Sequence, residues 1–465
     1  MSKLNFLKIL AVVVLLFCII TVSAYAQKTY EPTWESLDSR PIPQWYDDAK
    51  FGIKICWGLF SVPAWAPTIE NLQDVSNKNY AEWYWYNISD RMGHHRRYHA
   101  GTYGGDFQYQ HFAPMFKAEL WEPKEWAELI KRAGAKYIIL ITKHHDGYCL
   151  WPNTESWNWN SVNIGPHRDI VGELTKAIKA EGIKMGMYYS LYEWYNPLYN
   201  SDVDRYVEQH MIPQMKDLIT RYEPDLFYGD GEWDHPSEVW KTREFLTWLF
   251  NESSIRDHVV INDRWGNETR SHHGGYYLSE YFKYTGENAQ LGPKHKWAET
   301  RSMSASFGYN RNEDIENYQT AEELIHLLVN CVCRGGNLCL DIGPSADGKI
   351  PVIMQERLLQ IGGWLDVNGE AIYGTRVWHA TNDGENICYT AKDGEVYAIC
   401  LKWPGKILTL ETPKTSGITK VSMLGYDGDI TWRNESGKMH IDVPQLSVDE
   451  MPCRYAYTFK LSGVK

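Results

Sequence analysis

Short apolar runs alternate with amphipathic stretches along most of the chain, from about Trp45 to Tyr373. Six of the runs predict buried strands, because they are short, rich in β-branched and aromatic residues, and bounded by turn residues. They cover residues 51–57, 137–142, 184–190, 225–229, 258–262 and 337–342. Residues 122–133, 170–180, 321–332 and 354–367 carry apolar side chains at helical spacing. The alternation indicates repeated βα units and a barrel of parallel strands, with two of eight strand positions unassigned.

The pattern changes after Tyr373, where short runs of alternating apolar and polar residues are separated by Gly, Asp and Pro. These runs predict an antiparallel β-sandwich over residues 374–465, following a barrel domain over residues 27–373. They cover residues 397–401, 406–410, 421–424, 439–443 and 455–461. Because the segment contains no cluster of titratable side chains, we expect it to pack against the barrel rather than to do chemistry.

The first 26 residues have the features of a signal peptide. Lys3 and Lys8 precede an apolar run from Ile9 to Val22, and small residues follow at cleavage spacing. The run is shorter than the roughly 20 residues that a membrane span needs. We therefore expect a secreted or periplasmic protein that has no membrane contact after the signal is removed.

The formal charge of −12 becomes −14 when Lys3 and Lys8 are removed with the signal. This acidic balance argues against nucleic acid as a partner, because phosphate binding needs a basic surface. The chain also has 21 Trp and 31 Tyr residues, whose flat rings suit the faces of sugars as well as protein cores. Cys331 and Cys333 lack a second ligand pair at suitable spacing, so no zinc site is predicted.

Polar residues collect directly after several predicted strands. Residues 143–147 follow one strand, residues 262–265 follow another, and Asp230 ends the run 225–229. In a parallel barrel all strand ends face the same opening, so these residues predict one site. Glycosidic bond hydrolysis needs two carboxyl groups, and Asp230, between Gly229 and Gly231 with Tyr228 alongside, is the predicted nucleophile. Glu232 points to the opposite side if the strand continues.

The second carboxyl group is less well defined by the residues. Glu280 lies among aromatic residues, which would desolvate its carboxyl group and suit a proton donor. Glu299 and Glu287 are alternatives.

His144 and His145 are interpreted as neutral hydrogen-bond partners of sugar hydroxyl groups rather than as metal ligands, because adjacent residues of a strand project to opposite faces. Arg264 is a further candidate partner of a hydroxyl group or the ring oxygen. Its alternative role is a salt bridge with Asp263 or another neighbour.

Several motifs, taken together and in order, resemble the α-L-fucosidases of glycoside hydrolase family twenty-nine. They are Phe51-Gly52-Ile53, Trp57-Gly58, Ser61 to Trp65, Phe112 to Phe116, Lys143 to Gly147, Asp230 to Trp233, Asn262 to Gly266, Ser306 to Asn310 and Asn337 to Pro344. The resemblance implies a (β/α)8-like barrel followed by a C-terminal antiparallel β-sandwich. It also implies retaining, exo-acting release of α-L-fucose from fucosylated oligosaccharides or glycoconjugates, without a cofactor or metal. No oligomeric state is predicted.

The resemblance also assigns roles to single residues. Asp230 falls on the nucleophile and Glu280 on the proton donor, with Glu299 as the alternative acid. The implied fucose-binding positions are Cys56, Trp83, His144, His145, Tyr189, Tyr228, Arg264 and Phe307, although Tyr188 lies next to Tyr189.

The chain departs from the family pattern at three positions. Many relatives carry a Glu, sometimes considered as the acid, directly after the Lys-Trp pair, and here Ala298 occupies that position and Glu299 follows. Cys56 stands where relatives usually have a His that contacts a fucose hydroxyl, and Lys54 stands where a nonpolar residue is common. A thiol is a weaker hydrogen-bond partner than imidazole. The departures leave two alternatives open: a related hydrolase of another sugar such as an α-L-galactoside, and a carbohydrate-binding barrel with weakened catalysis.

Overall fold

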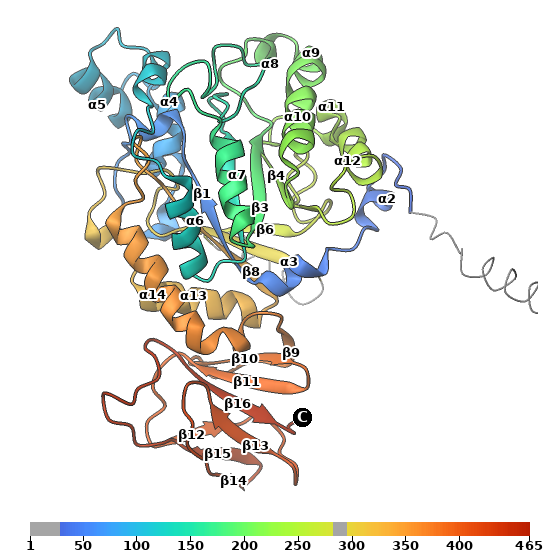
Figure 1. Ribbon diagram of the computed structural model, residues 1–465, viewed down its shortest axis with the longest axis vertical. Helices are drawn as coiled ribbons and strands as arrows, with labels where there is room; N and C mark the ends of the chain where they lie inside the picture. The colour runs from blue at the N-terminus through green and yellow to red at the C-terminus, as the bar shows by residue number, and fades with distance from the viewer. Residues whose placement is uncertain (1–27, 282–294) are drawn as a thin grey trace, which may run out of the picture.

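The computed structural model describes residues 28–281 and 295–465, so the predicted signal peptide and Glu287 lie outside the described residues. Eight parallel strands form one sheet in the order β5-β4-β3-β2-β1-β8-β7-β6. Figure 1 labels β1, β3, β4, β6 and β8 in the upper domain. A parallel bridge between Asn262 and Tyr276 joins the two edges of the sheet and closes the barrel. The strands are β1 (Phe51–Ile55), β2 (Tyr137–Lys143), β3 (Lys184–Ser190), β4 (Leu226–Asp230), β5 (Val260–Ile261), β6 (Tyr277–Glu280), β7 (Trp297–Ser302) and β8 (Gly336–Ile342).

All six predicted barrel strands are present, and the predicted barrel and sandwich architecture is confirmed. The two strands that the apolar pattern missed are β6 and β7. Strand β7 has the polar sequence Trp-Ala-Glu-Thr-Arg-Ser, yet each of its residues is buried. A strand that is enclosed on both faces by protein normally reads as an apolar run, so polar buried strands escape a search for such runs.

Helices surround most of the barrel, and the four predicted helical segments correspond to α6, α7, α13 and α14 (Figure 1). The turns between β5 and β6 contain no helix. The main helices are α5 (His94–Tyr103), α6 (Pro123–Arg132), α7 (Ile170–Ala180), α10 (Ile212–Tyr222), α12 (Thr242–Asn251), α13 (Ala321–Cys333) and α14 (Val352–Asn368). Shorter helices are α2 (Trp34–Asp38), α3 (Gln44–Ala49), α4 (Tyr84–Asn87), α8 (Leu198–Ser201), α9 (Val203–Tyr206) and α11 (Ser237–Trp240). Among the described residues no helix is both long and apolar enough to cross a membrane.

The barrel interior is filled largely by aromatic side chains. Tyr46, Tyr137 and Tyr276 pack together near the start of the strands, with ring centroids 4.6 and 5.4 Å from that of Tyr46. Gly52 makes room for them, because a Cβ atom there would lie 2.3 Å from the Tyr137 ring. The lower barrel is therefore a packed core, and only its upper end is available for a ligand.

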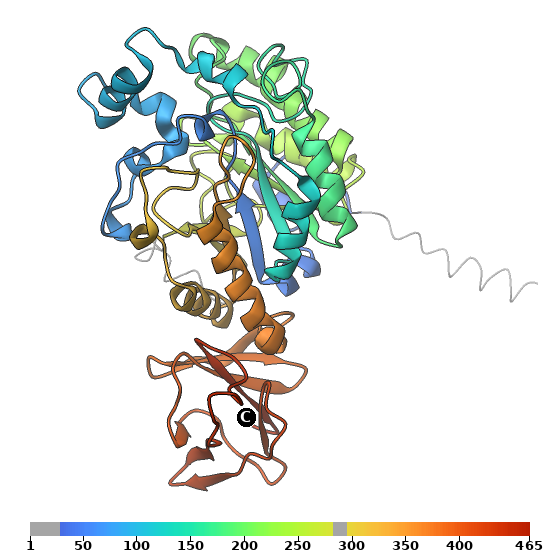
Figure 2. The ribbon, with the colours of Figure 1, turned by 60° about the vertical axis from the view of Figure 1, so that its left-hand side comes forward.

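The C-terminal domain consists of two antiparallel sheets that enclose a separate apolar core (Figure 2). One sheet has the order β13-β16-β11-β10-β9 and the other β12-β15-β14. The strands are β9 (Arg376–Asp383), β10 (Ile387–Lys392), β11 (Glu395–Cys400), β12 (Ile407–Leu410), β13 (Lys420–Met423), β14 (Trp432–Glu435), β15 (Lys438–Asp442) and β16 (Tyr457–Ser462). The five predicted strands of this region are present, and β9, β10 and β14 are additional.

Helices α13 and α14 connect the sandwich to the barrel (Figure 2). His326 of α13 hydrogen-bonds the Tyr455 carbonyl, and the Trp364 indole of α14 donates to the Ala456 carbonyl at 2.9 Å. Asn330 of α13 accepts hydrogen bonds at the same junction from the Cys388 thiol of β10 at 3.9 Å and from the Cys333 thiol at 3.4 Å. These contacts support the prediction that the sandwich packs on the barrel.

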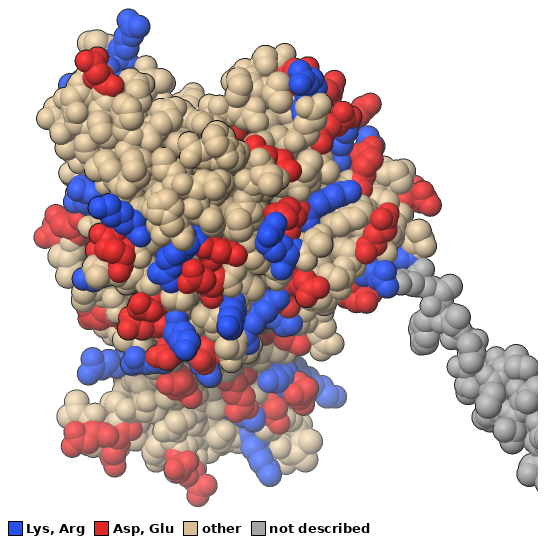
Figure 3. Space-filling model, turned by 45° about the horizontal axis from the view of Figure 1, so that its top comes forward, with Lys and Arg blue, Asp and Glu red and all other residues tan. Residues whose placement is uncertain are grey.

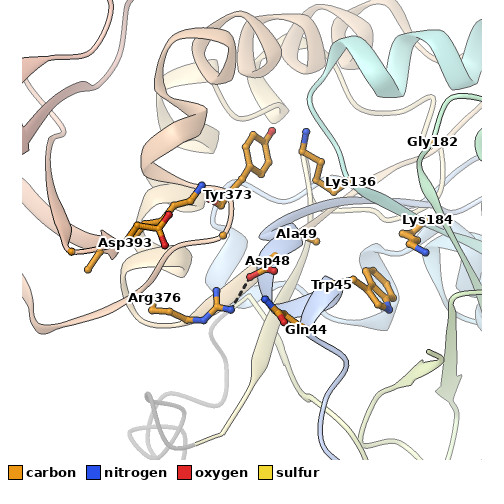
Figure 4. Close-up of a pocket in the computed structure, with 14 residues that line it drawn as sticks. Gln44, Trp45, Asp48, Ala49, Lys136, Gly182, Lys184, Tyr373, Arg376 and Asp393 are labelled. Carbon is orange, nitrogen blue, oxygen red and sulfur yellow. Dashed lines mark hydrogen bonds and ion pairs between the residues drawn. The ribbon is translucent and has the colours of Figure 1, made fainter. Parts of the chain in front are cut away.

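The junction also contains an open cleft below the barrel, between α3 and the turn that joins β10 to β11 (Figure 4). Arg376 of β9 points toward α3 and forms ion pairs with Asp47 and Asp48. Lys136 lies over the Tyr373 ring at 4.1 Å, and the Tyr373 hydroxyl donates to the Gly134 carbonyl. The polar groups of this cleft thus bind mainly to each other, and we interpret it as a joint between the domains.

Candidate active site

Two carboxylates lie at the upper end of the barrel and share one arginine. Asp230 is the last residue of β4 and Glu280 the last of β6. One guanidinium nitrogen of Arg264 donates to Asp230, and the other donates to Glu280 at 2.7 Å. The Arg264 side chain is almost fully buried, so its charge is little screened by water. The residues predicted as nucleophile and acid are therefore brought together by a third predicted residue.

Asp230 is held in its ionised form. Burial raises the pKa of Asp230, but the Arg264 charge and a 2.5 Å hydrogen bond from the Tyr188 hydroxyl outweigh burial, and the net pKa lies below its usual value. A carboxylate nucleophile must be ionised to attack carbon. Asp230 therefore meets this requirement throughout the neutral pH range.

The carboxylates face a cavity formed by residues from most of the barrel strands and the loops that follow them. The lining residues are Lys54, Cys56, Tyr80, Glu82, Trp83, Ile141, His144, His145, Tyr188, Asp230, Trp233, Arg264, Glu280 and Phe307. The surface toward the top of Figure 3 is mostly uncharged, and acidic and basic side chains are mixed over the sides. The cavity thus combines aromatic faces with a few charged groups, as sites for small polar ligands do.

His144 and His145 both line the cavity, although adjacent residues of a strand were expected to diverge. Strand β2 ends at Lys143, and the chain turns at Gly147 with φ 74°, so both imidazoles lie above the strand. The Ser190 hydroxyl lies 2.6 Å from both His145 Nδ1 and the Tyr192 carbonyl. Because that hydroxyl donates to the carbonyl, His145 Nδ1 carries the proton and Nε2 is an acceptor.

Burial keeps both imidazoles uncharged. It lowers the pKa of His145 to about 4 and that of His144 well below its ordinary value. Neutral imidazoles can accept hydrogen bonds from sugar hydroxyl groups. Within residues 28–281 and 295–465 no three His, Cys, Asp or Glu side chains are grouped so that they could hold a metal ion.

Aromatic rings form one side of the cavity. The Trp83 ring lies 5.1 Å from the His145 ring and 6.0 Å from the Trp233 ring. Phe307 lies on another side, 5.2 Å from the Tyr80 ring. Such rings pack against the apolar face of a sugar, so both predicted aromatic positions suit a sugar ligand.

Tyr189 does not line the cavity, and this expectation is corrected in favour of Tyr188. The Tyr189 hydroxyl donates to Gln214 of α10 at 2.7 Å and accepts from Lys143, on the outer side of β3. Tyr188 lines the cavity and contacts Asp230. Side chains alternate along a strand, so only one of two adjacent tyrosines can face inward. Tyr228 lies beneath the cavity, with its ring stacked 5.4 Å from the Tyr188 ring.

Glu299 is also placed away from the cavity. It lies fully buried within β7, and its charge acts on the Cys331 thiol of α13, which covers the outer face of the barrel. The buried Glu232 forms an ion pair with the partly exposed Arg270, at 2.5 Å. Glu280 is the candidate acid that the structure brings next to Asp230.

The sequence patterns missed several lining residues: Lys54, Tyr80, Glu82 and Ile141. Glu82 accepts a hydrogen bond from the Gly308 amide at 2.9 Å, and burial raises its pKa to about 7. Its position directly before Trp83 was a signal that could have identified it. Lys54 lies two residues before Cys56, and every second side chain of a strand faces the same side. The predicted position of Cys56 would therefore have placed Lys54 in the barrel interior as well.

Comparison with known proteins extends these observations to the whole chain. The sequence profile "Alpha-L-fucosidase" matches residues 17–370, and "Alpha-L-fucosidase C-terminal domain" matches residues 381–462. The chain belongs to the alpha-L-fucosidase family. Among its fucosidase relatives, the tissue alpha-L-fucosidases of Mus musculus and Homo sapiens are each 43% identical to it. The alignments cover 95% of this chain with 96% of the mouse and 94% of the human protein.

Solved fucosidase structures have the same fold. The alpha-fucosidase of Thermotoga maritima in complex with a mechanism-based inhibitor matches with a TM-score of 0.80 and 35% identity, covering 93% of this chain and 99% of that one. The same enzyme in complex with fucose matches with a TM-score of 0.79 and 35% identity, covering 93% and 100%. The arrangement of barrel and sandwich is therefore that of the fucosidases.

Proposed function

We propose that this chain is an exo-acting, retaining α-L-fucosidase that releases α-L-fucose from fucosylated glycans. The observation that carries the proposal is the sharing of one buried guanidinium by Asp230 and Glu280 at the cavity. Retaining glycosidases place their two carboxyl groups closer together than inverting ones, and one guanidinium spans only a short gap. Membership of the fucosidase family indicates that the sugar is α-L-fucose.

The reaction takes place in two steps. In the first, an Asp230 oxygen bonds to the anomeric carbon while the bond from that carbon to the leaving oxygen breaks, and Glu280 gives that oxygen a proton. Arg264 engages Oε1 of Glu280, which leaves Oε2 for the transferred proton. In the second, Glu280 takes a proton from water, the water oxygen bonds to the anomeric carbon, and the ester to Asp230 breaks.

The setting of the enzyme is part of the proposal. Residues 1–26 would direct export to the periplasm or the exterior, residues 27–373 would form the catalytic barrel, and residues 374–465 would support it. The partners would be fucosylated oligosaccharides or glycoconjugates, without nucleic acid or membrane.

A second candidate activity is hydrolysis of a related sugar, such as an α-L-galactoside. It is favoured by Cys56, which lines the cavity and is shorter than the imidazole that fucosidases usually have at this position. Burial raises the pKa of the Cys56 thiol well above its usual value, so it stays protonated and is a weak hydrogen-bond partner. A barrel that binds sugar with weakened catalysis is the remaining alternative.

Turnover of aryl α-L-fucoside and aryl α-L-galactoside separates these possibilities. We expect the fucoside to be preferred, and proton NMR to show α-L-fucose as the first product, because two inversions give retention. The Asp230→Gly variant should lose several orders of magnitude in turnover and form β-L-fucosyl azide when azide is added. A matched control is Glu232→Gln, which alters a buried carboxylate outside the cavity. Preference for the galactoside, or no turnover of either sugar, would contradict the proposal.

A further inference from the structure

A buried ion pair lies at the inner end of the active-site cavity. Lys54 of β1 and Asp341 of β8 are register partners on neighbouring strands. Lys54 Nζ lies 3.0 Å from an Asp341 carboxylate oxygen, and their side chains are 6% and 0% exposed. The pair thus occupies the barrel interior directly beneath the opening, where the levels below contain mainly tyrosine and aliphatic side chains.

The Lys54 ammonium reaches the level of the sugar-binding rings. Lys54 lines the cavity, and its Nζ lies 4.4 Å from the Phe307 ring centroid. The centroids of Tyr188 and Tyr228 lie 5.9 and 5.8 Å from the same nitrogen. Cys56 follows on the same inward face and is much shorter than lysine. The ammonium can therefore be approached from the cavity at the corner next to Cys56.

The pair has unused hydrogen-bonding capacity. An ammonium group has three donors, and Asp341 is the ion-pair partner that the described residues offer Lys54. Both Asp341 carboxylate oxygens are buried and neither has a hydrogen-bond partner among these residues, although Oδ2 is the ion-pair partner of Lys54. Buried charges are costly unless their polar atoms are satisfied, and apolar replacements for such pairs are often no less stable. A polar ligand at the cavity floor would satisfy the remaining donors.

The charges around the pair indicate a neutral ligand rather than an anionic one. Glu82, Asp230, Glu280 and Asp341 supply four carboxyl groups in or beside the cavity, against two cationic groups. Burial raises the pKa of Glu82 to about 7 and that of Asp341 to about 8, whereas Asp230 stays ionised, so a sulfate or carboxylate on the sugar would be repelled by Asp230. A sugar hydroxyl group accepts a hydrogen bond from the ammonium without this penalty.

We propose that Lys54 is a specificity-determining residue, whose ammonium donates a hydrogen bond to one ring hydroxyl of the bound sugar in the corner beside Cys56. Asp341 is the positioning residue that holds the ammonium there. The inference rests on the proposed function, because it names a recognition element of the same sugar site.

Deoxy sugars test the contact directly. The Lys54→Met variant removes the charge and shortens the side chain by one heavy atom. With aryl α-L-fucoside we expect kcat/KM to fall by about 10- to 100-fold, the range of a hydrogen bond to a charged group. With the 2-, 3- and 4-deoxy analogues, the same variant should show a much smaller loss for the one analogue that lacks the contacted hydroxyl.

Two further variants separate binding from folding. The Lys54→Met/Asp341→Leu double variant leaves no unpaired buried charge and should show the same analogue dependence, with a melting temperature close to that of the wild type. As a matched control, Lys143→Met removes another buried lysine, which pairs with Glu193 outside the cavity. It should affect every analogue equally. Equal losses on all analogues for the Lys54 variants, or no loss at all, would overturn the inference.

Binding of free L-fucose and its deoxy forms, measured by calorimetry, distinguishes this inference from the proposed function. If the wild type binds fucose without hydrolysing fucosides, the proposed activity fails, but the binding of the deoxy sugars by the wild type and by Lys54→Met still tests the inference. If the wild type hydrolyses fucosides but Lys54→Met binds every sugar as tightly as the wild type, the inference fails alone.

Discussion

Replacing Arg264 with methionine should move the acid limb of the pH profile upward. The guanidinium is the largest influence that counteracts burial of Asp230, whose side chain is 12% exposed. Removing one partner of a buried ion pair destabilises the charge that remains by roughly 3–5 kcal/mol. At about 1.4 kcal/mol per pKa unit, this would raise the pKa of Asp230 by about two to four units. The Tyr188 hydrogen bond remains, so we expect a shift near the lower end.

The measurement is kcat/KM on an aryl α-L-fucoside from pH 3 to 9. The wild type should keep its activity to low pH, because the pKa of Asp230 is lowered and the carboxylate stays ionised. In Arg264→Met the acid limb should lie about two units higher, and Arg264→Lys should fall between the two. Arg168→Met, which removes a partly exposed ion pair with Glu173, is the control and should leave the limb in place. Superimposed acid limbs for wild type and Arg264→Met would refute the reasoning.

Four further predictions follow from the site. Glu280→Ala should lower kcat/KM far more for alkyl fucosides than for activated aryl fucosides, because only poor leaving groups need a proton. The same dependence on the leaving group in Glu299→Ala would contradict the assignment of Glu280 as the acid. Tyr188→Phe should lower kcat on the order of tenfold by removing a hydrogen bond to Asp230, the proposed nucleophile, whereas Tyr189→Phe should leave kcat unchanged. The reverse pattern would exclude the placement of the two rings. Dialysis against a strong chelator should not change the rate, and activity restored by a divalent ion would argue against hydroxyl-binding imidazoles. The pKa of His145 is about 4 in the folded chain and about 6.5 in the unfolded chain, so the unfolded state binds more protons between these pH values. His145 should therefore lower the free energy of unfolding by roughly 3 kcal/mol as the pH falls through that window. Denaturant unfolding of the wild type and of His145→Gln at several pH values should show this difference, and parallel plots of unfolding free energy against pH would count against it.

The sequence alone determined the architecture, and it predicted Asp230 as the nucleophile. Strand and helix periods are local properties, so the barrel strands with apolar runs and the sandwich could be predicted. Asp230 was identified because it ends such a run next to glycines, and strand ends share one opening. The polar strands β6 and β7 lacked this signal, since their residues are buried by contacts that the local pattern does not encode.

The tertiary structure decided which side chains meet in the site. Alternation along β3 is visible in the sequence, but whether Tyr188 or Tyr189 faces inward depends on the register of the closed barrel, and a shift of one residue exchanges the two faces. The sharing of Arg264 by Asp230 and Glu280 joins three strand ends, and the pairing of Lys54 with Asp341 joins residues from opposite ends of the barrel sequence. Burial then sets the charge states at this site. These outcomes depend on distances through space and on exclusion of water, which arise only when the barrel closes.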